Sequence, residues 1–393
     1  MKWSSAISTR DSIGACIDEV IRATNEQLDG LESDLTIVFI SPHFRSHYTK
    51  IPGMIRERLN PGILIGCSGD GIIGAGEEVE GDAAISMTRA NLPEVSIKPF
   101  HIDAMELPDQ DTGPRVWWEW LGVKADPTPH FILLADPFSF RAEEFLQGVD
   151  FAYPNSVKIG GLASGTHSGD GNIFYAGDRI HTSGAVGVAL DGNIKVDTIV
   201  AQGCRPTGKL HKITKCHNAF LQALDGHPPF NVLEEMIANA NDYDRKLIQS
   251  SLFLGIEMNP LGDEPKQGDF LIRNIIGLDR ASGALSIGTL LREGQLVQFH
   301  LRDNITSAED LSLLLSQYTE QDQSKKASGA LLFSCLGRGK HLYGRANHDT
   351  DMFSSKLGGV PVGGFFCNGE IGPVGETTYL HGYTSSFGIF RAN

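Results

Sequence analysis

The sequence predicts an α/β protein of mixed α+β type, in which internally duplicated units of β-α-β plus antiparallel strands form mixed sheets covered by helices. Two observations support this class. Apolar segments with little alternation, such as 35–40, are separated by helix-length segments, which is typical of parallel strand pairs buried under helices. Glycine accounts for 45 of 393 residues and gathers after such strands, at 66–81, 160–171 and 358–375. Two modules are expected, for which an αββα sandwich is one arrangement.

The first elements are a helix and two buried strands. Apolar residues of 9–28, among them Ile17 and Val20, fall mostly on one face, which predicts an amphipathic helix. The apolar segments 35–40 and 63–65 then predict strands, and a second helical stretch at 51–59 connects them.

The same order of elements recurs three times along the chain. Each copy has a strand, a crossover, a strand that ends in Gly-rich sequence, and a third strand. The copies are TIVFIS (36–41), ILIGCSGDG (63–71) and AAISM (83–87); HFILLAD (130–136), VKIGGLASG (157–165) and GAVGVAL (184–190); and GALLFSC (329–335), VPVGGFFCNGE (360–370) and YTSSFGIF (383–390). A strand and a helix precede the later copies, at 96–102 with 115–121 and at 295–301 with 307–318. Such a long period indicates duplicated domains and not a solenoid of short repeats.

The remaining region, 195–294, matches this pattern only in part, and we interpret it as a fourth, degenerate copy. Within it, the sequence Asp-Gly-His-Pro-Pro at 225–229 interrupts regular structure. The expected division is therefore into two modules, 1–226 and 227–393.

Composition excludes several classes of protein. The 33 Lys+Arg against 48 Asp+Glu give a net charge of −15, which argues against sequence-independent binding to nucleic acid or anionic membranes. No apolar run approaches the roughly 18–20 residues of a membrane helix, and residues 1–5 lack the apolar core of a signal peptide. Six scattered cysteines without a CxxC pair favour free thiols in a reducing cytoplasm.

The motif at 69–74 is a literal GxGxxG after a strand. Binding a dinucleotide there requires a helix that begins at the motif, so that its N-terminus faces the pyrophosphate. The following residues, 75–81, contain two glycines and three acids and no apolar stripe, which argues against such a helix.

Candidate binding residues lie in the loops after the repeated strands. Glu370 stands among glycines and aromatic residues, so its carboxylate must be solvated in a cleft, paired, or used on a ligand amine. Arg338 follows the strand expected beside it. Together they could hold an amino-acid-like zwitterion, and the structural alternative is an Arg338–Glu370 ion pair. As another alternative, Ser68, Cys335 or Cys367 could serve as the nucleophile of a hydrolase or transferase.

Taken in order, the motifs resemble the FIST domain family, named after F-box and intracellular signal transduction proteins, from about residue 35 to 390. The N-terminal half carries LTIVFIS, LIGCSGDG, KIGGLASG, GAVGVAL and GCRPTGKLHKIT, and the C-terminal half carries GDFLIRNIIGLD, ALLFSCLGRG, VPVGGFFCNGEIGPVG and LHGYTSSFGIF. One departure is Gly382, because family members often have Asn after this His.

The resemblance implies a stand-alone cytoplasmic sensory protein that binds a small ligand and signals through a protein partner. An amino-acid-like ligand is one expectation. The expected function requires no cofactor, we assign no catalytic or metal-binding residue, and the protein could form a homo-oligomer. The expected ligand-binding residues are Gly66, Cys67, Ser68, Gly160, Gly161, Ser164, Cys335, Arg338, Gly364, Asn368, Glu370 and His381.

Two further alternatives accompany this interpretation. Because some family members resemble haem-based gas sensors, His101, His300 or His381 could be an axial ligand. A protein-interaction scaffold would instead expose an apolar patch, for which the crowded tryptophans within 117–120 are candidates.

Overall fold

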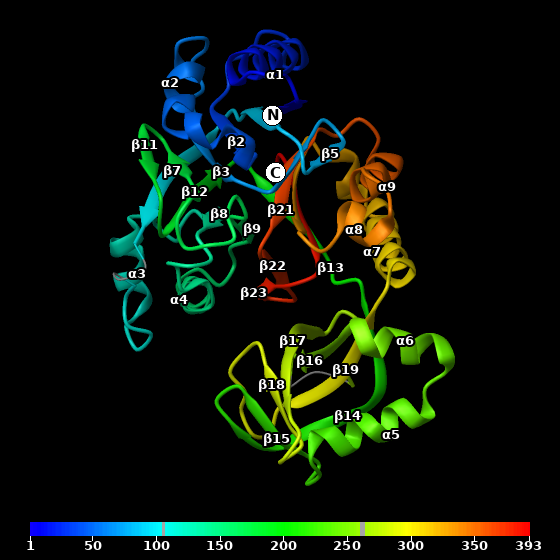
Figure 1. Cartoon of the computed structure of the whole chain (residues 1–393). Helices are drawn as coiled ribbons and strands as arrows, with labels where there is room; N and C mark the ends of the chain where they lie inside the picture. The colour runs from blue at the N-terminus through cyan, green and yellow to red at the C-terminus, as the bar shows by residue number, and fades with distance from the viewer. Residues whose placement is uncertain (104–106, 260–263) are drawn as a thin grey trace. The chain divides into compact units, whose positions relative to one another are not determined.

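The computed structural model describes residues 1–103, 107–259 and 264–393 (Figure 1). The chain forms two compact units. Unit 1 comprises residues 1–200 and 312–393, and unit 2 comprises residues 201–311. In the described ranges, unit 1 contains three six-stranded mixed sheets and unit 2 a closed six-stranded barrel. The mixed α/β class expected from the sequence is therefore confirmed.

Three segments of unit 1 share one order of elements. The first comprises β1 (Lys2–Ser8), α1 (Ile13–Leu28), β2 (Leu35–Ile40), η1 (Pro42–Lys50), α2 (Ile51–Arg56), β3 (Ile63–Ser68), β4 (Gly71–Gly74), β5 (Glu77–Glu80) and β6 (Ile85–Asn91). The second comprises β7 (Val95–Ile102), α3 (Pro114–Leu121), β8 (His130–Ala135), α4 (Ala142–Ala152), β9 (Lys158–Leu162), β10 (Phe174–Ala176), β11 (Arg179–His181) and β12 (Ala185–Gly192). The third comprises β13 (Lys195–Ala201), α7 (Asn304–Thr319), η3 (Asp322–Lys326), β20 (Gly329–Cys335), α8 (Gly339–Tyr343), α9 (His348–Leu357), β21 (Val362–Cys367), β22 (Glu370–Val374), β23 (Thr377–His381) and β24 (Ser385–Arg391).

The three sheets exchange hairpins in a closed cycle. Their strand orders are β1-β6-β2-β3-β10-β11, β7-β12-β8-β9-β22-β23 and β13-β24-β20-β21-β4-β5. Each sheet therefore has four strands from one segment and a hairpin from another. The hairpin of the second segment completes the first sheet, that of the third completes the second, and that of the first completes the third. No segment forms a complete sheet by itself.

Each sheet has one parallel pair at its centre, β2–β3, β8–β9 or β20–β21. Three glycines occupy corresponding positions in these pairs. Gly66 lies opposite Val38, Gly160 opposite Leu133, and Gly364 opposite Leu332. A Cβ atom at any of them would clash with the carbonyl oxygen of the residue opposite. These three expected binding residues are thus required for close approach of the strands.

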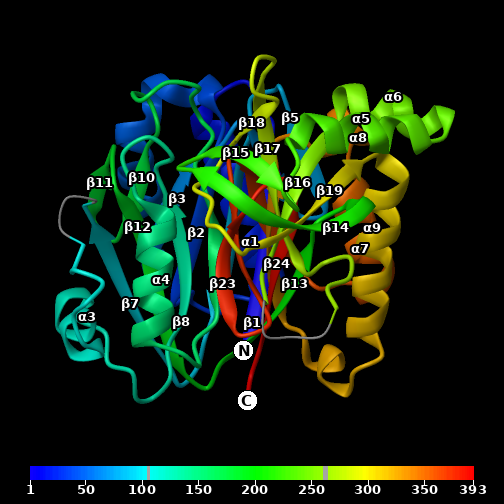
Figure 2. The same cartoon turned by 90° about the horizontal axis from the view of Figure 1, so that it is seen from below.

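The inner faces of the three sheets enclose one apolar core. Phe39 of β2 stacks on Phe365 of β21 with 4.8 Å between ring centroids, and its edge-on neighbour Phe333 lies at 6.5 Å. Helices cover the outer faces, and Figure 2 shows α3 and α4 beside β7 and β8. Trp117 of α3 is 1% exposed in the cluster that these helices cover, so it does not contribute to a surface patch.

Unit 2 consists of β14 (Cys204–His217), β15 (Phe220–Leu224), α5 (Pro229–Asn239), α6 (Asp242–Ser250), β16 (Leu252–Glu257), β17 (Phe270–Asp279), β18 (Ala284–Ile287) and β19 (Leu296–Arg302). Its strands close in the order β14-β15-β18-β17-β16-β19, and all of these pairs are antiparallel. The interpretation of 195–294 as a fourth copy is therefore wrong.

Unit 2 interrupts the third segment after β13, and its boundary at Leu311 falls inside α7. The strand predicted at 295–301 as the start of the third copy is β19 of the barrel, and β13 occupies the corresponding position beside β24. The predicted boundary at 226/227 falls between β15 and α5, inside unit 2. The compact units divide the chain elsewhere because β13 pairs within unit 1. Among the described residues, no helix is long and apolar enough to cross a membrane.

Candidate functional site

The ends of β3, β9 and β21 meet in unit 1, and most of the expected binding residues lie there. The Ser164 hydroxyl after β9 donates to the Phe366 carbonyl oxygen of β21 and accepts from the Asp70 N–H, at 2.9 Å. Asn368 Nδ2 donates to the Ala163 carbonyl oxygen at 2.9 Å. Residues from three loops, far apart in the chain, are therefore brought together as expected for the carboxyl ends of repeated strands.

The candidate nucleophiles at these strand ends differ in access. The Ser68 hydroxyl is buried, donates to Asn172 Oδ1 at 3.1 Å and accepts from the Ile173 N–H at 3.1 Å. Burial raises the pKa of the Cys67 and Cys367 thiols well above the ordinary value, which keeps them protonated. Cys335 at the end of β20 is partly exposed, so of the three candidates Ser68, Cys335 and Cys367 it is the one that a reagent can reach.

Arg338 is fully buried and forms an ion pair with Asp349 of α9, not with Glu370. Its Nε donates to Asp349 Oδ2 at 2.8 Å and its Nη2 to Oδ1 at 3.2 Å, a bidentate arrangement, and Nη2 also donates to Tyr343 Oη at 2.6 Å. Burial, the largest effect, opposes ionisation of Asp349, but the Arg338 charge and the hydrogen bonds from His348, Arg338 and Ser385 together outweigh it and lower the pKa of this carboxyl. The structural alternative, an Arg338–Glu370 ion pair, is therefore wrong.

Glu370, at the start of β22, is also buried. Its Oε2 accepts from the N–H of Thr384 at 3.0 Å and from the Thr384 hydroxyl at 2.8 Å. His381 lies opposite Glu370 in the β22–β23 pair, and His381 Nε2 is 2.9 Å from the Gly372 carbonyl oxygen. Gly161 faces Glu370 in β9, where a Cβ atom would clash with the Cys367 sulfur. These side chains hold the hairpin in place.

Sequence reasoning missed Tyr383, which adopts the left-handed backbone conformation with φ 71°. Such a conformation is strained for a bulky residue, and strain of this kind gathers at functional sites. The Tyr383 carbonyl oxygen accepts from Arg338 Nη1 at 3.5 Å. Asn368 is exposed, and Cys335 and Tyr383 are partly exposed, so these three residues contribute to the accessible surface of the strand ends. A positive φ at Tyr leaves no signal in a single sequence.

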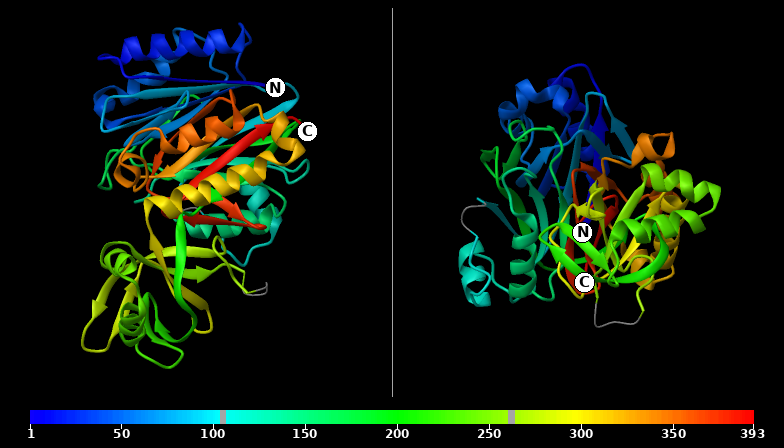
Figure 3. Two further views of the ribbon diagram at one scale, coloured as in Figure 1. Left: turned by 90° about the vertical axis from the view of Figure 1, so that its right-hand side faces the viewer. Right: turned by 60° about the horizontal axis from the view of Figure 1, so that its bottom comes forward.

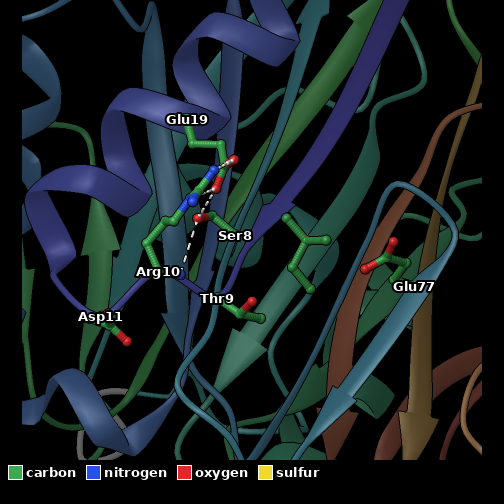
Figure 4. Close-up of a pocket in the computed structure, with 7 residues that line it drawn as sticks. Ser8, Thr9, Arg10, Asp11, Glu19 and Glu77 are labelled. Carbon is green, nitrogen blue, oxygen red and sulfur yellow. Dashed lines mark hydrogen bonds and ion pairs between the residues drawn. The ribbon is translucent and has the colours of Figure 1, made fainter.

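A separate pocket lies in the first segment, where β1 leads into α1 (Figure 4). Its volume is about 470 Å³. The lining residues are Ile7, Ser8, Thr9, Arg10, Asp11, Glu19 and Glu77. Glu77 comes from the hairpin strand β5 and faces the β1–α1 connection across the pocket. Because Ile7 is the one aliphatic lining residue, the pocket suits a polar ligand.

The pocket places one cation among carboxylates. Arg10 Nε donates to Glu19 Oε2 at 3.0 Å and Arg10 Nη2 to Oε1 at 2.9 Å, while the Ser8 hydroxyl donates to the same carboxylate at 2.6 Å. These hydrogen bonds, the one from Arg10 first, lower the pKa of Glu19 to about 2. Glu19 therefore stays ionised and holds the guanidinium in place. The N–H donors on Arg10 Nη1 take no part in this ion pair.

The three histidines named as haem ligands do not fit that role. The ring nitrogens Nε2 of His101 and His381 are held by backbone carbonyl oxygens at 3.1 and 2.9 Å. The ring of His300 is buried in the barrel wall, 4.8 Å from the ring centroid of Phe270. None of them lines the 470 Å³ pocket. Within the described ranges, no group of three or more His, Cys, Asp or Glu could hold a metal ion.

The chain matches two protein-family models, the FIST N domain over residues 34–227 and the FIST C domain over residues 229–373. Similar curated proteins come from mycobacteria. The uncharacterized protein Rv0628c of Mycobacterium tuberculosis strain H37Rv is 32% identical over 393 residues, which cover 99% of this chain and 100% of that protein. The uncharacterized protein Mb0898c of Mycobacterium bovis is 30% identical over 386 residues, which cover 98% and 97% respectively.

Proposed function

Because the chain belongs to the FIST family, whose domains are generally sensory domains that bind small ligands, we propose that it is a cytoplasmic sensor of an amino-acid-like ligand and signals through a protein partner. The observation that supports this proposal is the 470 Å³ pocket between β1, α1 and β5. Its volume lies in the range of small-molecule sites, about 300–1,000 Å³.

The charges of the pocket match a zwitterion. Arg10, oriented by Glu19, can donate to a ligand carboxylate together with the hydroxyls of Ser8 and Thr9. Asp11 and Glu77 supply negative charge for a ligand ammonium group. A neutral apolar ligand would leave these polar groups desolvated without a partner, which disfavours its binding.

Isothermal calorimetry with the standard amino acids and related amines tests this proposal. Arg10→Gln removes the charge that would face the carboxylate, and a hydrogen bond to a charged group contributes about 1.5–3 kcal/mol. We expect its dissociation constant for the ligand to rise at least about tenfold. Arg22→Gln, on the exposed face of α1, is the matched control and should bind as wild type. Unchanged binding by Arg10→Gln contradicts this location.

The strained Tyr383 favours a second location for the same function, the accessible strand-end surface of Cys335, Asn368 and Tyr383. There the buried Arg338 and Glu370 would position the loops instead of touching the ligand. Asn368→Ala separates the two locations because its side chain is exposed. If Asn368→Ala weakens binding and Arg10→Gln does not, the ligand binds at the strand ends.

A further inference from the structure

The exchanged hairpin β4–β5 of the first segment lies against helices α8 and α9 of the third. Strand β4 pairs with β21, so β5 becomes the outer strand of the third sheet. Glu78 and Glu80 lie two positions apart in β5 and therefore share a face. That face is turned to the helices, since Glu78 reaches α9 and Glu80 reaches α8.

Both glutamates cap helices that begin more than 250 residues later in the chain. Glu80 Oε1 accepts from the Lys340 N–H of α8 at 2.9 Å, and Glu78 Oε1 accepts from the Thr350 N–H of α9 at 2.9 Å. In return, the Glu78 N–H donates to Asn347 Oδ1, the N-cap of α9, at 2.7 Å. The first turns of both helices thus obtain acceptors from another segment, where helices normally use a neighbouring side chain.

Gly339 allows this contact. A Cβ atom there would clash with the Glu80 carboxylate, and its φ of 60° is one that glycine adopts without strain. Two positions of the sequence Cys-Leu-Gly-Arg-Gly at 335–339 are thereby explained, because Arg338 pairs with Asp349 and Gly339 leaves room for Glu80.

The surroundings of Glu78 make its ionisation costly. Glu78 is 3% exposed, and burial, followed by the charge of Asp349, raises its pKa to about 7. The charged groups that act on Glu78 are Asp349 of α9 and Glu80 of its own strand. Lys340 and His341 of α8 act on Glu80, while Arg338 and His348 pair with Asp349. The nearest cation to Asp349, Arg338, is already engaged by that carboxylate in a bidentate pair.

The other two exchanged hairpins are held differently. In the first sheet, Arg56 of α2 pairs with Asp178 at 2.7 Å beside β11. In the second, Asp150 of α4 accepts from the Thr378 N–H at 2.6 Å and also pairs with Lys158 at 2.8 Å. Each of these contacts includes a cation and an anion. At β5, by contrast, the carboxyl group of Glu78 that caps α9 lies near a second carboxyl group, that of Asp349.

We propose that strand β5 is a proton-controlled latch, in which neutral Glu78 keeps α9 closed on the exchanged hairpin and loss of its proton to solvent loosens this contact. In the folded protein Glu78 holds its proton to higher pH than in the unfolded chain. The stabilisation is therefore complete below about pH 4.5 and is lost as the pH rises through about 7. Opening would release the N-terminus of α9 and the face of β5.

Hydrogen exchange followed by mass spectrometry on the full-length protein tests the latch. After correction for the intrinsic pH dependence of exchange, we expect the protection of residues 348–357 to fall at least about threefold between pH 6 and pH 8.5. Residues 142–152 of α4, a helix without histidine or cysteine, are the internal reference and should keep their protection. If the protection of residues 348–357 does not change in the wild-type protein, the proposal is overturned whatever the variants do.

The variant Glu78→Gln tests whether Glu78 is the source of the pH dependence. Its amide oxygen can still accept from Thr350, but it cannot ionise, so protection of residues 348–357 should become independent of pH. Glu80, whose pKa is also raised by burial, remains in this variant, so a pH dependence that persists would have a source other than Glu78 and would overturn the proposal. Asp82→Asn, at an exposed residue just after β5 and outside the pocket, should behave as wild type.

Discussion

Single residues at the strand ends show why charge and sequence pattern predicted a site there, but not which residues pair with its charged side chains. Arg338 and Glu370 do lie at neighbouring strand ends, as expected, yet each has a closer partner. Asp349 is in α9 and Thr384 follows β23. Neither position carries a pattern in the sequence that marks it as facing a buried charge. The composition of a loop indicates chemistry, whereas the choice of partner depends on long-range packing.

Removing the charge of Arg338 should destabilise unit 1 strongly. Arg338→Met leaves the carboxylate of Asp349 buried without its cation, and breaking a buried pair in this way costs about 3–5 kcal/mol. Urea unfolding measures the loss. Adding Asp349→Leu to the same variant removes the orphaned charge and should recover part of the stability; a double variant no more stable than the single one contradicts this reasoning.

Thiol labelling should separate the cysteines by access. Cys335 and Cys216 are partly exposed, whereas Cys16, Cys67, Cys204 and Cys367 are buried. In the native protein, a maleimide reagent read by mass spectrometry should modify the first two and spare the other four. Fast modification of Cys367 would show that the strand ends open to solvent, contrary to the structure.

At the scale of elements, local sequence predicted the strands of each segment but not the exchange of hairpins. The predicted strand 35–40 coincides with β2 because a buried run of β-branched and aromatic residues carries its own signal. The hairpin β4–β5 has short strands, and its partner β21 lies almost 300 residues away. No local pattern distinguishes β21 from β3 as the partner, so only the structure reveals the exchange.

The parallel pairs should be intolerant of a single methyl group. Gly160→Ala introduces a Cβ atom against the carbonyl oxygen of Leu133, which must force β8 and β9 apart at a cost of about 1–3 kcal/mol or more. Gly53→Ala, in α2 with no atom near the added methyl, should instead be neutral or stabilising. Thermal unfolding of both variants compares the two outcomes, and equal midpoints would refute the packing role of Gly160.

The β10–β11 hairpin should respond to acid in the opposite sense to the β5 latch. His181 stacks on His101 of β7 with 3.6 Å between ring centroids, and burial, with the His101 charge, lowers the pKa of His181 to about 4. The neutral ring is therefore favoured in the folded state. Stability from this contact is present above about pH 6.5 and falls as the pH drops toward 4. His181→Phe should flatten the pH dependence of thermal unfolding in this range; a slope unchanged from wild type would exclude the contact as its source.

On the scale of the whole molecule, the sequence predicted three related stretches but placed the start of the third incorrectly. An inserted barrel of ordinary globular composition separates β13 from α7, and the apolar strand β19 of this insert stands in the sequence where the missing strand was expected. Sequence order alone cannot tell an insertion from a degenerate copy when both supply strands at the same spacing. The pairing of β13 with β24 shows that the barrel is an insertion in the third segment.

The closed exchange of hairpins gives unit 1 no natural first or last segment. The two ends of the chain already meet, since Trp3 of β1 stacks on Phe390 of β24 with 4.4 Å between ring centroids (Figure 3). A circular permutant that joins residue 393 to residue 1 by a short Gly/Ser linker, with new ends at the exposed residues Pro93 and Glu94, should therefore fold with a thermal midpoint close to that of the parent. A permutant opened inside β9 should fail to fold. In this sense the junctions between the segments are equivalent places at which the chain can begin and end.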